Sequence, residues 1–83
     1  MTTHIAPDHI GTIGSIVRFH RKRAGLSRIA LADLAGIGKT VVFDLENGKT
    51  TVRVDTLFAV LTALNISVLL DGPIIDQWKE TGT

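Results

Sequence analysis

The 83-residue chain contains no cysteine, which excludes disulfides, thiolate nucleophiles and cysteine-based zinc sites. Residues 1–7 have neither the basic segment nor the apolar core of a signal peptide. The longest apolar stretch, around Val68, Leu69 and Leu70, is far shorter than the roughly 20 residues of a membrane-spanning helix. These three absences together predict a cytoplasmic protein.

The chain also has almost no net charge, +1, but its charges are unevenly placed. Residues 9–53 contain eight Lys or Arg and three Asp or Glu, whereas residues 54–83 contain one Lys and four Asp or Glu. A basic first part with an acidic tail predicts polyanion binding by the first part. The alternative is that these are scattered charges that only keep the chain soluble.

Hydrophobic residues make up 45% of this short chain. A chain of this length buries only about 60% of the surface that it exposes when unfolded. It therefore has more apolar side chains than a small monomer can hide, and this surplus predicts self-association.

Apolar spacing predicts helices at about 9–24, 28–35, 39–47 and 54–64, with a possible helical turn over 74–79. Gly25, Gly36 and Gly48 are placed to end the first three helices, and Ser27 is placed to cap the second. Gly14 is expected to admit a close neighbour. His20, Leu31 and Leu34 are expected to pack inward.

The segment that follows the fourth predicted helix favours a β-strand. Residues 66–71 are short, rich in β-prone side chains and bounded by Asp71-Gly72-Pro73. A lone strand leaves unpaired backbone groups, so the predicted partner is the same strand of a second copy. The dimer interface would then contain Ile66, Val68, Leu69 and Leu70. The alternative is an extended apolar tail that covers its own core.

The spacing of these features carries a family resemblance. Residues 13–64 resemble the Cro/C1-type (XRE) helix-turn-helix of phage repressors and bacterial regulators. The matching landmarks are Gly25-Leu26-Ser27, Leu31-Ala32, Leu34-Ala35-Gly36-Ile37 and Leu45-Glu46-Asn47-Gly48-Lys49. The extension from Thr51 through Leu70 is similar to antitoxins of the HipB type.

The resemblance implies an all-α, lambda-repressor-like bundle of four to five helices, with a C-terminal β-strand that pairs across a homodimer. The implied organisation is a flexible N-terminus (1–8), a DNA-binding domain (9–65), a dimerisation strand (66–71) and a tail (72–83). The chain departs from the family pattern at Arg28, where Gln is usual, and at Gly38, where Ser or Thr is usual. Phe43 and Asp44 also differ from the usual polar and basic residues.

In the helix-turn-helix layout, the third helix enters the DNA major groove by its N-terminal end. Base contacts are then expected from four residues on its outer face: Lys39, Thr40, Phe43 and Asp44. Phosphate contacts are expected from Ser27, Arg28, Lys49 and Arg53 at the helix ends. The alternative for the four outer residues is an ordinary solvated helix face. By resemblance, Arg21 and Glu46 form a structural ion pair that holds the third helix against the first.

The implied function is repression of transcription by a homodimer bound to an inverted-repeat operator. The HipB likeness adds the role of antitoxin in a HipBA-like type II module that represses its own operon, with a HipA-like kinase toxin as partner. Ile74, Ile75 and Trp78 are the candidate residues for that partner, unless Trp78 packs on its own dimer. The alternatives are a repressor without a toxin partner, or a protein-interaction module with a degenerate recognition helix.

Catalysis and cofactors are not expected. His4, His9 and His20 lack metal-ligand spacing with any carboxylate, and Ser15 and Ser27 have no general base at a motif spacing. Gly38-Lys39-Thr40 is not a phosphate-binding loop, because the glycine-rich approach and the preceding strand are missing.

Overall fold

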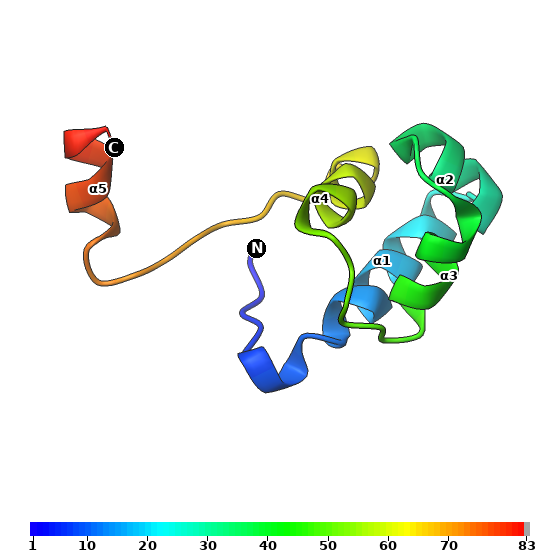
Figure 1. Ribbon diagram of the computed structural model, residues 1–83, viewed down its shortest axis with the longest axis horizontal. Helices are drawn as coiled ribbons and strands as arrows, with labels where there is room; N and C mark the ends of the chain where they lie inside the picture. The colour runs from blue at the N-terminus through cyan, green and yellow to red at the C-terminus, as the bar shows by residue number, and fades with distance from the viewer. Residues whose placement is uncertain (83) are drawn as a thin grey trace.

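The computed structural model describes residues 1–82 and contains only helices in that part of the chain. A short 3-10 turn, η1 (Pro7–His9), precedes four helices that form one bundle (Figure 1). A fifth helix stands apart from the bundle at the end of an extended segment. The helices are α1 (Thr12–Arg23), α2 (Arg28–Ala35), α3 (Lys39–Glu46), α4 (Val54–Ala63) and α5 (Ile75–Thr81).

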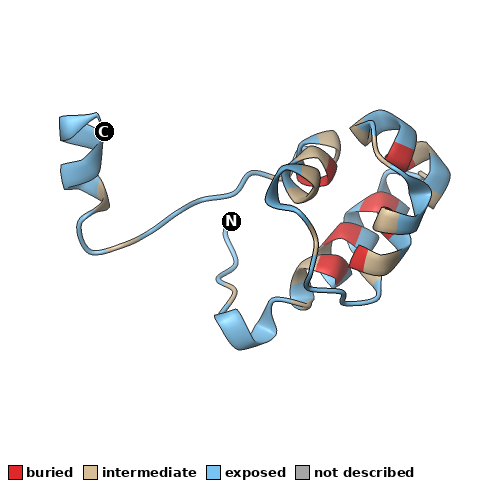
Figure 2. Ribbon diagram, viewed as in Figure 1, coloured by how far each residue is buried: buried red, intermediate tan, exposed pale blue. Residues whose placement is uncertain are grey.

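The core lies where the first four helices meet. α2 packs against both α3 and α4, and α1 packs against α3. Figure 2 shows the buried positions confined to these four helices. Burial of this apolar surface is the main term that stabilises the bundle. The buried apolar residues are Val17, Leu31, Ala32, Val42, Leu45, Val60 and Leu61.

Gly14 permits the close approach of α1 to α3, as predicted. A Cβ atom at this position would lie 1.8 Å from the backbone oxygen of Leu45 and 2.9 Å from its carbonyl carbon. No side chain fits in that space, so the two helices meet backbone to backbone at this point. The approach brings the C-terminal half of α3 against the first turns of α1.

The predicted helix ends are confirmed at the two turns that flank α2. Gly25 and Gly36 both have positive φ values, +73° and +72°, which glycine adopts without strain. The Ser27 hydroxyl accepts the backbone N–H of Ala30 at 3.0 Å and so caps the first turn of α2. The turn at Gly25 therefore sets the direction of α2, and the turn at Gly36 sets the direction of α3.

The prediction for the first helix was wrong in two respects. The α-helix begins at Thr12 rather than near residue 9, because η1 and a bend precede it. His20 does not pack inward: it is exposed, and its Nδ1 donates to the Ile16 carbonyl oxygen at 2.7 Å. A ring that bonds its own preceding turn lies along the helix surface instead of entering the core.

Leu34 was also misplaced by the sequence pattern: it is 63% exposed. The inward face of α2 is formed by Leu31, Ala32 and Ala35, and Leu34 lies beside that face rather than within it. In α4, Val54 and Phe58 are likewise exposed. These exposed residues leave apolar surface around the bundle.

The strand predicted over 66–71 is not formed within residues 1–82 of a single copy, and its pairing with a second copy stays a prediction. α4 ends at Ala63 and is followed by a turn in which Asn65 has a φ of +58°. The Ile66 N–H still donates to the Leu61 carbonyl oxygen at 2.9 Å. Beyond it, no backbone–backbone hydrogen bond within residues 1–82 involves residues 67–71. A strand needs a paired neighbour, and a single copy offers none here.

The extended segment and α5 together form a C-terminal arm, residues 67–82. The molecule measures 41 × 25 × 25 Å, and Figure 1 shows the arm extending its long axis away from the bundle. No arm residue is buried. Five of its large apolar side chains are exposed: Val68, Leu69, Leu70, Ile74 and Trp78.

Candidate nucleic-acid interface

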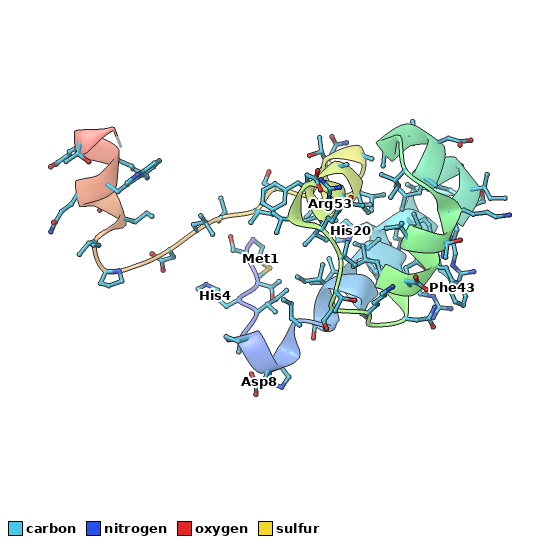
Figure 3. All side chains as sticks on the ribbon, viewed as in Figure 1. Met1, His4, Asp8, His20, Phe43 and Arg53 are labelled. Atoms are coloured by element: carbon cyan, nitrogen blue, oxygen red, sulfur yellow. The ribbon has the colours of Figure 1, made fainter. Side chains whose placement is uncertain are left out.

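The outer face of α3 carries the residues predicted to read bases. Val42 and Leu45 turn into the core, so the side chains on the opposite side of this helix face outward. Lys39, Thr40 and Phe43 are all exposed, and Figure 3 shows Phe43 on the outer surface of the bundle. The first turn of α3, with its free backbone N–H groups, thus points to solvent beside a cationic and an apolar side chain.

Arg21 and Glu46 meet between α1 and the end of α3. Arg21 Nε donates to Glu46 Oε2 at 2.6 Å, and Arg21 Nη2 donates to Oε1 at 3.0 Å. The third guanidinium nitrogen, Nη1, donates to the Leu26 carbonyl oxygen at 2.9 Å. One buried guanidinium therefore joins three parts of the motif: α1, the turn before α2, and the end of α3.

The Glu46 side chain is only 1% exposed, but the guanidinium groups of Arg21 and Arg28 beside it stabilise its negative charge. Burial by itself raises the pKa of the Glu46 carboxyl. The hydrogen bonds and positive charges of Arg21 and then Arg28 lower this pKa by more than burial raises it. The net pKa lies below the ordinary value, and the hydrogen bond to Glu46 raises the pKa of Arg21. The pair is thus charged at neutral pH.

Arg28 lies where α2 approaches α3, and it contacts both the carboxylate and the recognition helix. Its Nε donates to Glu46 Oε1 at 3.3 Å, and its Cζ lies 5.4 Å from the centroid of the Phe43 ring. Together with Lys39 and Thr40, Arg28 and Phe43 line a surface depression of about 540 Å³. The sequence placed Arg28 among the phosphate contacts, whereas the structure brings it to the face of α3.

Asp44 and Lys49 are brought together at the other end of α3. Lys49 Nζ lies 3.5 Å from Asp44 Oδ2, and the Lys49 side chain is about half exposed. The sequence left two roles open for Asp44, acceptance from a base or orientation of a nearby cation, and the second is what this geometry offers. An exposed pair of this kind adds at most about 1 kcal/mol of stability.

Two other predicted phosphate contacts, Arg53 and Ser27, each have a second role within the chain. Arg53, at the start of α4, makes two hydrogen bonds to Asp55, at 3.2 and 2.9 Å, and both side chains are largely exposed. The Thr56 N–H, aided by the charge of Arg53, lowers the pKa of Asp55. Ser27 uses its hydroxyl oxygen as the α2 cap.

Two residues of this region were missed by reasoning from the sequence. Ile29 is exposed in the first turn of α2 and lines the same depression as Phe43. Asn47 Nδ2 donates to the Phe43 carbonyl oxygen at 2.7 Å, which closes the last turn of α3. The sequence held a signal for Asn47, since it lies in the Glu-Asn-Gly motif, but none for Ile29.

The predicted dimer and partner residues lie on the other side of the fold from this helix pair. Ile66 packs partly against the core, whereas Val68, Leu69 and Leu70 are exposed along the extended segment. In and before α5, Ile74 and Trp78 are exposed, and Trp78 is 55% accessible. The structure therefore does not bring these residues into the α2–α3 region.

Neither a metal site nor a membrane-spanning helix is present within residues 1–82. No three His, Asp or Glu side chains within residues 1–82 are grouped so that they could hold a metal ion. In the same part of the chain, no helix has both the length and the apolar character needed to cross a membrane.

Comparison with known proteins agrees with the geometry of α2 and α3. The family model described as helix-turn-helix matches residues 17–70. The chain belongs to the helix-turn-helix family. In this family's layout α2 is the first helix of the motif and α3 is the second, the one that proteins of this kind place in the DNA major groove.

A relative from Sinorhizobium fredii has a similar sequence. It is named an uncharacterized HTH-type transcriptional regulator, y4mF, and is 38% identical over 61 residues. The matched region covers 74% of this chain and 80% of that protein. The likeness therefore extends over most of both chains. By family and by this likeness, the chain is a regulator of the helix-turn-helix type.

Proposed function

We propose that this helix-turn-helix protein is a transcriptional repressor that binds double-stranded DNA through α3. The observation that carries the proposal is the outward face of α3, where Lys39, Thr40 and Phe43 stand exposed beside Arg28. Lys donates to guanine edges, Thr contacts either base type, and an apolar ring suits a thymine methyl group. The buried Arg21–Glu46 pair supports the proposal because it fixes α3 relative to α1.

The electrostatics of this face favour a polyanion. One buried carboxylate, Glu46, accepts from two guanidinium groups, so the Arg21–Glu46–Arg28 cluster keeps one net positive charge. Arg28 and Lys39 line the same depression, and Lys49 extends from the other end of α3. Lys49, Arg53 and the α2 cap at Ser27 remain proposed phosphate contacts, which position a protein without reading sequence.

The proposed active form is a homodimer. Residues 67–71 are extended, make no backbone–backbone hydrogen bond within residues 1–82, and expose Val68, Leu69 and Leu70. Pairing of this segment with its copy in an antiparallel ribbon would satisfy those backbone groups and cover the apolar side chains. Substitution of Val68 by proline, which removes an N–H donor, is expected to convert a dimer to a monomer in sedimentation equilibrium. A dimer of unchanged strength would contradict this pairing.

We further propose that the protein is the antitoxin of a HipBA-like module and binds a HipA-like kinase through its tail. The exposed Ile74 and Trp78, close to the acidic side chains of α5, support an interface there, since tryptophan is a frequent interface anchor. Co-purification with the product of an adjacent kinase-like gene, lost in Trp78→Ala, is the expected result. The absence of such a gene would leave a repressor without a toxin partner.

The DNA-binding proposal is tested by selecting bound sites from a random duplex pool at two salt concentrations. The expected result is an inverted repeat with half-sites about 34 Å apart, one helical turn, and an affinity that falls steeply with salt. Lys39→Ala should abolish the enrichment. Lys79→Ala removes the same charge from α5 and serves as the matched control, which should leave it intact.

An absence of enrichment would overturn the proposal. If the wild-type protein bound duplexes only weakly and without sequence preference, α3 would be a degenerate recognition helix. The protein would then be best studied as an interaction module, through the exposed residues of its arm.

A further inference from the structure

We propose that Arg28 and Phe43 act as one base-reading unit for two neighbouring base pairs, a G·C pair and a pair that carries a pyrimidine methyl group. In this unit, the Arg28 guanidinium donates to guanine and the Phe43 ring contacts the C5 methyl of thymine. The inference rests on the proposed function, DNA binding through α3, and specifies part of the sequence that this face recognises.

The contact between the two side chains joins the two helices of the motif. The guanidinium carbon of Arg28 lies 5.4 Å from the Phe43 ring centroid, within the range of a cation–π contact. Phe43 is 50% exposed, and the Arg28 side chain is 40% exposed. Each side chain thus has one side held by the other and a further side open to a ligand in the depression that both line.

Glu46 determines which atoms of Arg28 remain available. Arg28 uses Nε for Glu46 Oε1 at 3.3 Å, and its side chain forms no other hydrogen bond within residues 1–82. Its two terminal nitrogens are therefore available as a pair of donors. Two donors of this kind match guanine O6 and N7, the commonest specific contact of arginine in the major groove.

Phe43 supplies the apolar half of the unit. Its ring has no hydrogen-bonding group, so it gains most from the thymine methyl group among the major-groove edges of the bases. The two contacts go to different base pairs, because a guanine pairs with cytosine, which carries no methyl group. Neighbouring pairs are stacked about 3.4 Å apart and their edges are displaced sideways by helical twist, which suits groups 5.4 Å apart.

The lysine variant of Arg28 separates this inference from a simple phosphate contact. Lysine keeps the positive charge but has neither the planar fork nor the ability to stack as arginine does. Arg28→Lys should retain affinity for non-specific DNA and the salt dependence of binding. Lysine can still donate to a guanine edge but lacks two donors in a fixed fork, so the preference for guanine at one position should fall by about tenfold, while the rest of the selected site stays the same.

Altered bases test each half of the unit on the site selected by the wild-type protein. Uracil in place of the thymine removes only the methyl group and should weaken wild-type binding about three- to tenfold. The same change should have no further effect on Phe43→Ala. Replacement of the guanine by 7-deazaguanine removes N7, and should weaken the wild-type protein more than it weakens Arg28→Lys, because only arginine holds N7 and O6 with two fixed donors.

A second Arg–Phe contact in this chain provides matched controls. Arg23 lies over the Phe19 ring at 4.9 Å on α1, outside the depression. Arg23→Lys and Phe19→Ala remove the same groups and should leave the base preferences unchanged. Thermal unfolding of all four variants checks that each is folded, as expected for partly exposed side chains.

The outcomes separate this inference from the proposed function. If Arg28→Lys keeps the wild-type base preferences and Arg28→Ala weakens all sequences alike, with a salt slope lower by about one, Arg28 is a phosphate contact and the inference fails alone. It also fails alone if the selected repeat has no adjacent guanine and thymine that depend on these residues. If the wild-type protein selects no sequence, the proposed function fails and the inference fails with it.

Discussion

The bundle and the C-terminal arm both contain large apolar residues, but these residues are buried in the bundle and exposed in the arm. In α1–α4, Val17, Leu31 and Val42 are fully buried because four helices converge on them. In the arm, residues as apolar as Leu69, Leu70 and Trp78 are exposed, because no other element reaches them (Figure 2). Burial thus depends on a facing element, and an apolar segment without one remains available to a partner.

Polar interactions show the same contrast. The bundle encloses the Arg21–Glu46 pair, where desolvation makes each charge depend on the other. The intra-chain hydrogen bonds of α5 are local, such as the one from the Thr81 hydroxyl to the Trp78 carbonyl oxygen. A change in the bundle should therefore affect the whole fold, whereas a change in the arm should affect only binding.

The largest effect is expected from Glu46→Ala. Removal of this carboxylate leaves the buried guanidinium of Arg21 without a counter-charge, although the hydrogen bond to Leu26 remains, and should cost about 3–5 kcal/mol. A domain of this size has a total stability of only about 4–12 kcal/mol, so fold and DNA binding should be lost together. Urea unfolding measures the loss, with Asp44→Ala, a half-buried acid on the same helix, as the control. Normal thermal stability of Glu46→Ala would contradict the structural role of the pair.

The next largest effect is expected from Gly14→Ala. The new methyl group would lie 1.8 Å from the Leu45 oxygen, so α1 and α3 would have to move apart at a cost of about 1–3 kcal/mol or more. Gly11→Ala is the matched control, since its nearest neighbour would be 3.7 Å away and its φ of −62° suits alanine. Equal midpoints of unfolding for the two variants would show that the close approach is absent in solution.

Acid should weaken the bundle through Glu46. Because the folded-state pKa of Glu46 is lower than its unfolded value of about 4.5, the stabilisation is complete above that pH. It is lost progressively as the pH falls through the folded-state pKa. Glu46→Gln should therefore lose less stability than the wild-type protein between neutral pH and pH values below about 4.5. Parallel stability profiles for the two proteins would contradict this assignment.

The smallest effect on stability is expected in the arm. Ile74→Ala combined with Trp78→Ala should change the unfolding free energy by no more than about 0.5 kcal/mol. In the bundle, by contrast, Leu45→Ala should cost about 2–5 kcal/mol. Trp78 is the only tryptophan of the chain, so its fluorescence reports directly on the arm. Emission typical of a buried ring in the dilute wild-type protein would show that the arm packs on the bundle.

Reasoning from the sequence worked best where neighbouring residues decide the structure. The ends of α2 followed from Ser27 and Gly36, since a cap and a positive φ are properties of a few consecutive residues. The outer position of Lys39, Thr40 and Phe43 on α3 followed from their helical spacing. Reasoning from the sequence failed at Leu34, because helical spacing gives the side of a helix on which a residue lies but not whether a neighbouring helix extends far enough to cover it.

The strand over 66–71 was predicted as one half of a pair, and a single copy does not form it. The composition of residues 66–71 favours an extended backbone, and the chain is indeed extended there. A strand also requires a neighbour, and no residue within 1–82 supplies one. Local preference alone therefore specified the conformation of the segment but not its pairing.

The sequence by itself determined the helices of the bundle, the two turns that flank α2 and the outward position of Lys39, Thr40 and Phe43, because these depend on interactions within a few residues. Tertiary structure alone decided that Arg28 contacts Glu46, 18 residues away, and lies over Phe43. Such contacts form only after α2 and α3 have packed on a common core, which fixes the distance between side chains that local preferences leave independent.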